Sequence, residues 1–199
     1  TLVWCVVADA CLPDHAATDA AAYAFDDSPV LPLWFVRPFS RWDSAHLLRV
    51  ARQGYADDLD AAFFPLFPFL ARAAATALPR LAPAERLIVA GVFVSNACFV
   101  GAAAAAYAAT AALLDETTAF RVGVAFCLTP ASVFCSTAYS ESLGALTAFA
   151  GSACLARDAP WRAALAWSCH AATRSNGFLY AAVVAVDGAA RAATPAALD

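Results

Sequence analysis

The sequence contains no lysine and no methionine, and it carries few charges of either sign. Only 14% of its 199 residues are charged, whereas soluble domains carry about 25%. A chain of this size must cover most of its surface with polar groups to stay in water, so a water-soluble domain is not expected. Methionine is missing even at position 1, and we therefore expect the chain to be a piece of a longer protein.

The few charges do not indicate binding to nucleic acid. All 12 basic residues are arginine, the acidic residues number 16, and the net charge is -4. Nucleic-acid-binding domains gather positive charge on one face, so no nucleic-acid partner is expected.

The seven cysteines show no C-x-x-C pair. Zinc sites and disulfide frameworks need paired or clustered spacing. We expect no metal site, and we expect free, mostly buried thiols that act as small hydrophobes, at Cys5, Cys11, Cys98, Cys127, Cys135, Cys154 and Cys169.

Long uncharged runs are present instead, and 62% of the residues are hydrophobic. Residues 87–114 carry no charge, and a helix of that length exceeds the bilayer core of about 30 Å. It is predicted to cross the membrane. Further spans are predicted at 61–79, 142–156 and 163–186. Residues 122–140 contain Thr129-Pro130 and are predicted to form two half-helices that enter the membrane and return.

The first third of the chain differs from this pattern. Residues 1–12 are apolar but too short to cross, and they predict the tail of a first transmembrane helix. Residues 13–60 are rich in aspartate, arginine and aromatics, which predicts a long extramembrane loop. Within it, residues 44–54 have one apolar stripe and predict a short amphipathic helix on the membrane surface. The predicted class is therefore all-α: one membrane-embedded domain over 1–199, a polytopic transmembrane helical bundle with its spans in 61–199.

The arginines near short loops predict the orientation. Arginine accumulates on the cytosolic side of membrane proteins, which places Arg80 and Arg162 in the cytosol. Asp43, Glu116 and Arg174 are then predicted on the opposite side.

Ionisable groups in an apolar chain are functional candidates because they are costly at membrane depth. Asp43 could cap the amphipathic helix or act as a general base toward a sugar hydroxyl; spacing does not decide. Arg174 interrupts an apolar stretch and needs an anionic partner, either Glu141 or a lipid-linked phosphate. Phe63 and Phe64 fit an aromatic belt at the membrane interface, a groove for a lipid tail, or a surface for a sugar.

Seven motifs occur in one order along the chain. They are P-D-H at 13–15, R-W-D-S-A-H at 41–46, G-Y at 54–55, A-F-F-P-L-F-P at 62–68, F-C-L-T-P-A-S-V-F at 126–134, Y-S-E-S at 139–142 and R-S-N-G at 174–177. Together they resemble the family of GPI mannosyltransferase 2 enzymes, over about residues 7–180. The resemblance implies a multi-pass enzyme of the endoplasmic reticulum membrane with GT-C architecture and a luminal site.

The activity implied by the resemblance is transfer of the second mannose, in α1,6 linkage, from dolichyl-phosphate mannose to a GPI precursor. The lipid-linked donor and acceptor are the expected partners, no cofactor is expected, and a small membrane subunit is left open. With this chemistry in mind, Asp43 is the predicted general base and Arg174 the group that stabilises the leaving phosphate. The predicted substrate-binding residues are Arg41, Trp42, His46, Phe63, Phe64, Tyr139, Glu141, Arg174 and Asn176.

Two other functions stay open from the residues. One is a different glycosyltransferase of similar architecture that uses a dolichyl-phosphate sugar. The other is a polytopic transporter or scaffold, in which Arg174 and Glu141 serve transport or assembly. A transporter is expected to show paired inverted repeats with broken helices, and the sequence shows none.

Overall fold

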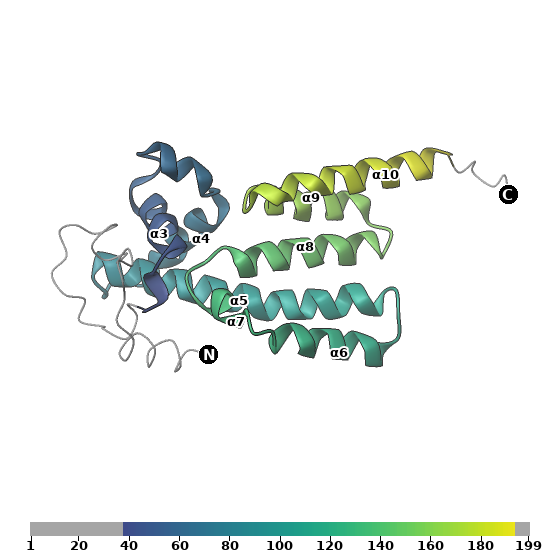
Figure 1. Ribbon diagram of the computed structural model, residues 1–199, viewed down its shortest axis with the longest axis horizontal. Helices are drawn as coiled ribbons and strands as arrows, with labels where there is room; N and C mark the ends of the chain where they lie inside the picture. The colour runs from purple at the N-terminus through teal and green to yellow at the C-terminus, as the bar shows by residue number, and fades with distance from the viewer. Residues whose placement is uncertain (1–37, 194–199) are drawn as a thin grey trace.

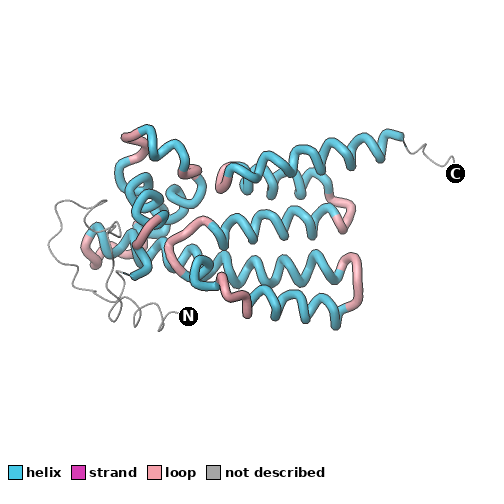
Figure 2. The backbone as a smooth tube through the Cα atoms, in the orientation of Figure 1, coloured by secondary structure: helices cyan, strands magenta, loops and turns pink. Residues whose placement is uncertain are grey.

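The computed structural model of the 199-residue chain describes residues 38–193. The predictions for residues 1–37, including the helix tail at 1–12, the P-D-H motif, Cys5 and Cys11, lie outside the described residues. Within residues 38–193 the chain is helical and contains no strand (Figures 1 and 2). The predicted all-α class is confirmed for this part of the chain.

The helices in order are α3 (Asp43–Gln53), η2 (Asp58–Ala62), α4 (Leu66–Ala75), α5 (Pro83–Ala111), α6 (Glu116–Cys127), α7 (Ser132–Ser136), α8 (Glu141–Leu155), α9 (Pro160–Ala171), η3 (Ser175–Leu179) and α10 (Tyr180–Ala193).

Helix α5 is the central element, with 29 residues. Its first residue is Pro83, whose fixed φ suits the first helical position, and its many alanines favour the helix. Among residues 38–193, α5 is the one helix long and apolar enough to cross a membrane, judged by length and composition. The helix predicted at 87–114 is thus confirmed, with both ends a few residues earlier in the chain.

The direction of the neighbouring helices follows from their contacts with α5. Phe126 of α6 packs on Phe99, with ring centroids 5.2 Å apart, while Gly123 lies beside Tyr107, so α6 runs antiparallel to α5. Ser95 bonds to Tyr139 and Gly101 faces Leu146, so α8 runs parallel to α5.

Helix α9 returns along α8, and α10 returns along α9 (Figure 1). Asp115–Glu116 and Arg157–Arg162 therefore lie at one end of the bundle, and the start of α8 and the end of α9 lie at the other.

This arrangement corrects the predicted orientation. Asp43 and Arg174 share one end of the bundle, as predicted, but Glu116 lies at the opposite end with Arg162. The chain does break at Thr129-Pro130, between α6 and α7, because a proline disfavours the α conformation in the residue before it. However, α6 runs from Glu116 toward the Asp43 end, beside the second half of α5. It does not return to the end where it started.

Two predicted spans are wrong in extent. The helix within 61–79 has only 10 residues, which rise about 15 Å, half of a bilayer core. The stretch 163–186 is not one helix, because η3 separates α9 from α10. Arg174 therefore sits at a break between helices, where a polar side chain is accommodated more easily than inside a span.

Helix α3 forms where the amphipathic pattern predicts it, but its apolar face meets protein and not a membrane surface. Leu48 is buried together with Phe67 of α4 and Ile88 of α5. The N–H of Leu66, at the start of α4, donates to the carbonyl of Ala172 after α9 (2.9 Å). This bond joins the α3–α4 part of the chain to the helical bundle.

The described cysteines are free, as predicted, but they are not uniformly buried. Cys98 and Cys135 are buried, Cys154 and Cys169 are half-buried, and Cys127 is exposed. Cys127 is the last residue of α6, next to the break at Thr129-Pro130.

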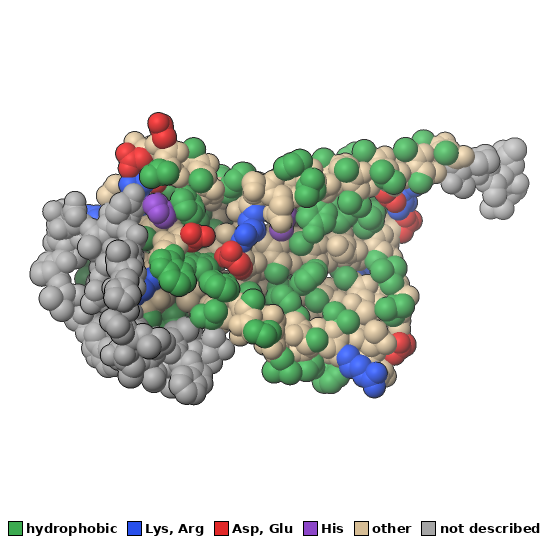
Figure 3. Space-filling model, viewed as in Figure 1, with side chains coloured by type: hydrophobic (Ala, Val, Ile, Leu, Met, Phe, Trp, Pro, Cys, Tyr) green, Lys and Arg blue, Asp and Glu red, His purple; other side chains and the backbone are tan. Residues whose placement is uncertain are grey.

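Large hydrophobic side chains cover much of the outer surface of the bundle. The exposed fraction reaches 65% at Phe120 of α6 and 70% at Val186 of α10. On the face shown in Figure 3, hydrophobic side chains cover much of the helices, while charged side chains gather at the right end of the bundle, near the middle of the view and at the upper left. This distribution is typical of a bundle surrounded by lipid.

Candidate functional site

A cavity of about 120 Å³ lies where α3, η2, α8 and η3 meet. It brings together five of the ten predicted site residues: Asp43, Phe63, Phe64, Glu141 and Arg174. Leu47, Ala62, Ser140, Thr173 and Ser175 complete its lining. Four motifs, which contribute lining residues from Asp43 to Ser175, thus meet at one small space.

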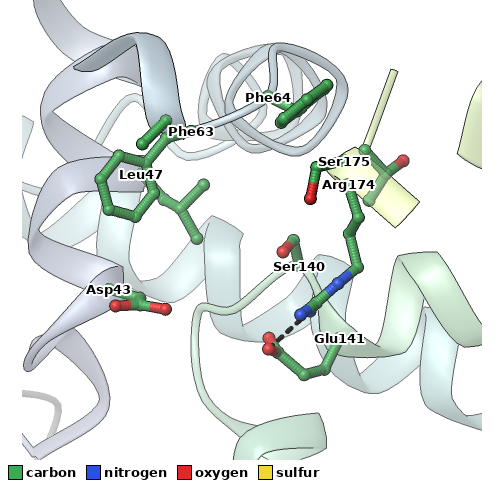
Figure 4. A pocket seen from close by; sticks show the side chains of 10 residues that line it. Asp43, Leu47, Phe63, Phe64, Ser140, Glu141, Arg174 and Ser175 are labelled. Atoms are coloured by element: carbon green, nitrogen blue, oxygen red, sulfur yellow. Dashed lines mark hydrogen bonds and ion pairs between the residues drawn. The ribbon is translucent and has the colours of Figure 1, made fainter. Parts of the chain in front are cut away.

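Asp43 forms one wall of the cavity (Figure 4). It is the first residue of α3, and the N-cap position is held by Trp42, without a side-chain cap. The interpretation of Asp43 as an N-cap is therefore wrong. Its carboxylate lies in the first turn, where the helix dipole favours negative charge.

The Arg174–Glu141 pair forms the facing wall (Figure 4). Arg174 Nη1 donates to Glu141 Oε1 over 2.6 Å, and both side chains are about one-third exposed. Glu141 begins α8 and Arg174 lies just before η3. Of the two anionic partners that the sequence left open for Arg174, the structure contains Glu141. This hydrogen bond uses one of the five N–H donors of the guanidinium, so the pairing is compatible with an additional anion.

Aromatic rings form the third side of the cavity. Phe63 and Phe64 belong to the segment between η2 and α4, and the Phe63 ring stacks on His46 at 4.6 Å between centroids. The Tyr55 hydroxyl donates to the carbonyl of Phe63 (2.7 Å). His46 therefore supports the wall from behind Phe63, and it is not among the lining residues.

An ion-pair cluster anchors the segment that carries these rings. Arg49 of α3 is buried and bonds to both Asp57 and Asp60, and Asp60 is fully buried. Burial raises the pKa of Asp60, but hydrogen bonds from the N–H of Asp57, from Arg49 and from the N–H of Ala56 lower it more, so the pKa lies below its usual value. Arg49 is a charged residue within the predicted amphipathic helix. It is buried because these carboxylates accompany it.

Tyr139 and Arg41 meet next to the cavity without lining it. The Tyr139 hydroxyl donates to the carbonyl of Arg41 (3.1 Å), which ties the start of α3 to the link before α8. Trp42, between Arg41 and Asp43, has φ 54°, a left-handed conformation that costs a residue with a side chain about 1 to 3 kcal/mol. Trp42 is 61% exposed. Arg41, Trp42 and Tyr139 thus lie around the start of α3, next to Asp43.

Asn176, predicted to bind substrate, points elsewhere. Its Oδ1 lies 3.2 Å from Nε2 of His170 in α9, and it is not among the residues lining the cavity. His170 was not singled out in the sequence, because a histidine next to apolar residues carries no spacing signal.

Polar residues on α5 are a second group that sequence reasoning missed. Ser95 donates to the carbonyl of Tyr139 (2.8 Å), and Asn96 donates to the carbonyl of Ser136 (3.0 Å). Both acceptors lie in the link that leads into Glu141. Two adjacent polar residues in an otherwise apolar helix were a usable signal, since buried polar groups need hydrogen-bond partners.

The cavity combines groups suited to transfer at a phosphate-linked carbon. It holds a carboxylate that can accept a proton, a guanidinium that can bind phosphate, and aromatic surface. Within residues 38–193, no group of three or more His, Cys, Asp or Glu is placed to hold a metal ion.

Comparisons with known proteins agree with these motifs. Residues 26–192 match the model of a family described as Mannosyltransferase (PIG-V). The chain is similar to GPI alpha-1,6-mannosyltransferase 2 of Rattus norvegicus, with 36% identity over 146 residues, which are 70% of this chain and 30% of the relative. It is similar to the human protein of the same name, with 32% identity over 193 residues, 90% of this chain and 38% of the relative.

A fungal relative extends the similarity. GPI mannosyltransferase 2 of Cryptococcus neoformans is 31% identical over 132 residues, 64% of this chain and 31% of the relative. The chain thus spans about a third of the length of these curated relatives. No solved structure matches.

Proposed function

The chain belongs to the PIG-V mannosyltransferase family, and from this premise we propose that its cavity is part of the active site of a GPI α1,6-mannosyltransferase. The observation that carries the proposal is the convergence of Asp43, Glu141 and Arg174 on one cavity. The proposed donor is dolichyl-phosphate mannose, the acceptor is a GPI precursor with one mannose, and the membrane is that of the endoplasmic reticulum.

The proposed reaction is a single displacement with inversion at the anomeric carbon. An acceptor hydroxyl oxygen attacks that carbon, and the carbon–oxygen bond to phosphate breaks with its electron pair going to dolichyl phosphate. Asp43 takes the proton of the acceptor hydroxyl. Since the donor linkage is β, inversion yields the α linkage.

Arg174 stabilises the negative charge that grows on the leaving phosphate. Such stabilisation is strongest where donors are already oriented and water is scarce. The pair with Glu141 holds the guanidinium at the cavity before the donor binds. Phe63 and Phe64 supply apolar surface for the sugar face or for the start of the dolichol chain.

Replacing Asp43 with asparagine tests the proposal. Asp43→Asn keeps the size of the side chain and removes its basicity, so the chemical step slows by roughly 100-fold to 10,000-fold. The assay is mannose transfer from dolichyl-phosphate mannose to the mono-mannosylated GPI precursor, in microsomes that lack the endogenous enzyme and contain the full-length protein.

Asp58→Asn is the matched control, because Asp58 is an exposed carboxylate in η2 outside the cavity lining. It should transfer mannose like the wild type. An Asp43→Asn protein at normal abundance with activity within a few-fold of wild type would show that the base lies elsewhere.

A further inference from the structure

His170 is a buried imidazole that the proposed reaction does not use. It is 4% exposed and sits one residue before the end of α9. Its Nδ1 lies 2.8 Å from the carbonyl oxygen of Gly144 and 3.1 Å from the hydroxyl of Thr147, both on α8. Its Nε2 lies 3.2 Å from Asn176 in η3. One ring therefore connects three helices.

The contacts fix the orientation of this ring. A carbonyl oxygen only accepts hydrogen bonds, so Nδ1 carries a proton and donates to Gly144. The side-chain amide of Asn176 can donate or accept, and it satisfies Nε2 in either protonation state of the ring. Burial of a polar ring is costly without such partners.

The turn that carries Arg174 wraps around His170. The N–H groups of Thr173 and Arg174 both donate to the carbonyl of His170 (2.8 and 2.9 Å), and the N–H of Gly177 donates to the carbonyl of Arg174 (3.0 Å). A Cβ at Gly177 would lie 2.3 Å from Cα of Ala171, so the turn folds tightly back on α9.

Gly144 brings His170 and Arg174 together on the surface of α8. A Cβ at this position would lie 2.9 Å from Cδ of Arg174 and 3.5 Å from Cε1 of His170. The aliphatic part of Arg174 therefore crosses α8 directly over Gly144, beside the imidazole. Its guanidinium then reaches Glu141, one turn earlier on the same helix.

We propose that His170 is a positioning residue for Arg174. Through Asn176 and Gly144, it holds the R-S-N-G turn against α8 so that the guanidinium faces the cavity. This inference rests on the proposed function, because it assigns His170 a role in binding the leaving phosphate.

A double-mutant cycle with full-length protein in microsomes tests the inference. His170→Ala should lower mannose transfer about 10-fold in the wild-type background, and less than about twofold in the Arg174→Ala background, because contacting residues do not act additively. If His170 only stabilises the protein, His170→Ala should lower transfer by the same factor in both backgrounds. This result would overturn the inference.

Two further His170 variants separate the two arms of the ring. The amide of His170→Gln reaches the Nε2 position and retains the link to Asn176, whereas that of His170→Asn reaches only the Nδ1 position. His170→Gln should therefore retain several-fold more activity. The reverse order would overturn the role of Asn176 in the inference.

Ser168→Ala is the matched control on α9, because its hydroxyl is exposed and donates only within the helix, to the carbonyl of Ala164. It should leave transfer unchanged. Gly144→Ala would place a methyl group 2.9 Å from Cδ of Arg174 and at ordinary contact distance, 3.5 Å, from Cε1 of His170, so it should displace Arg174 and reduce transfer at normal protein abundance. If Arg174→Ala keeps near-normal activity, the proposed function fails at Arg174 and the inference fails with it. If Arg174→Ala loses about 100-fold or more and His170→Ala lowers the remaining transfer by the same factor as in the wild-type background, the inference alone fails.

Discussion

At the residue scale, Arg174 illustrates how a charge is accommodated in an apolar chain. It lies at a helix break, pairs with Glu141 over 2.6 Å, and lines the cavity with Asp43. The pair neutralises the guanidinium when no other anion is present. The phosphodiester of the proposed donor carries one negative charge, like a carboxylate, and can bind the remaining N–H donors of the guanidinium. The phosphate gains a second charge when it leaves.

Replacement of Arg174 separates these two roles. We expect Arg174→Ala to lower turnover by about 100-fold to 1,000-fold, as the loss of one oriented donor does at other sites of charge development. Arg174→Lys should recover only part of this loss, because an ammonium lacks the planar fork. The readout is mannose transfer in microsomes, and Arg162→Ala, an exposed arginine at the other end of the bundle, serves as the control. Near-normal transfer by a stable Arg174→Ala protein would reduce Arg174 to the structural partner of Glu141.

Asp60 gives the corresponding prediction for stability. Because its pKa is lowered in the folded state, its contribution to stability is full above the unfolded pKa, about 3.9. The contribution is lost as the pH falls through the folded pKa. We expect Asp60→Asn to destabilise the protein by about 3 to 5 kcal/mol near neutral pH, because it leaves the buried Arg49 without part of its compensation.

The measurement for Asp60 is the thermal midpoint of the detergent-solubilised protein at several pH values. The gap between wild type and Asp60→Asn should narrow as the pH falls below about 4. Asp58→Asn, exposed in the same short helix, should follow the wild type at every pH. A gap that does not change with pH would show that charge is not the source of the stabilisation.

At the element scale, small residues determine how closely the helices of the bundle approach. A Cβ at Gly151 of α8 would lie 2.2 Å from Nε1 of Trp167 in α9. The same indole donates to the carbonyl of Ala148 (3.2 Å). Close approach through small residues is the common mode of helix association in lipid, and here it brings His170 of α9 to the surface of α8.

Gly151→Ala should therefore destabilise the α8–α9 contact, by about 1 to 3 kcal/mol from overpacking. The measurement is the thermal midpoint in detergent, with mannose transfer in parallel. Gly188→Ala in α10 is the matched control for a glycine-to-alanine change inside a helix, because no atom lies within 4 Å of its added Cβ. It should be neutral or stabilise by about 0.5 to 1 kcal/mol, as alanine does in a helix. Equal effects of the two variants would contradict the packing argument.

At the scale of the whole molecule, the contacts between helices determine which loops share an end of the bundle. The Arg80 link follows α4 directly and precedes α5, so it lies at the α3 end of the bundle (Figure 1). The antiparallel course of α6 and the parallel course of α8 bring Glu116 and Arg162 to the opposite end (Figure 1). That end carries both acidic and basic residues. The prediction from arginine positions alone therefore put Glu116 and Arg162 on opposite sides, although they lie at the same end.

Cysteine accessibility in sealed microsomes tests this arrangement. Single cysteines at positions 58 and 80 of the full-length protein, in a background with the native cysteines replaced, should share one accessibility. Single cysteines at positions 116 and 162 should share the other. If cysteines at positions 58 and 116 are labelled from the same side, the two ends of the bundle do not lie on opposite sides of the membrane, and the prediction is wrong.

The sequence alone predicted several features of the fold and of the candidate site. Composition predicted an all-α membrane protein, the apolar run predicted α5, and Thr129-Pro130 predicted the break after α6. These properties depend on local rules: length against bilayer thickness, helix propensity, and the restriction that proline places on the residue before it. The motifs likewise identified Asp43, Glu141 and Arg174 as candidates, because a charge in an apolar chain needs a partner wherever it lies.

Only the tertiary structure decided how these parts meet. That Asp43 and Arg174 face one cavity, that Asn176 turns away to His170, and that Glu116 lies with Arg162 all depend on contacts between segments far apart in the sequence. Many of the decisive bonds end on backbone carbonyls, such as those of Gly144, Tyr139 and Ala172. Every residue carries such a carbonyl, so no sequence pattern marks the ones that will be used. Their partners are selected by helix packing, which depends on the fit of whole surfaces.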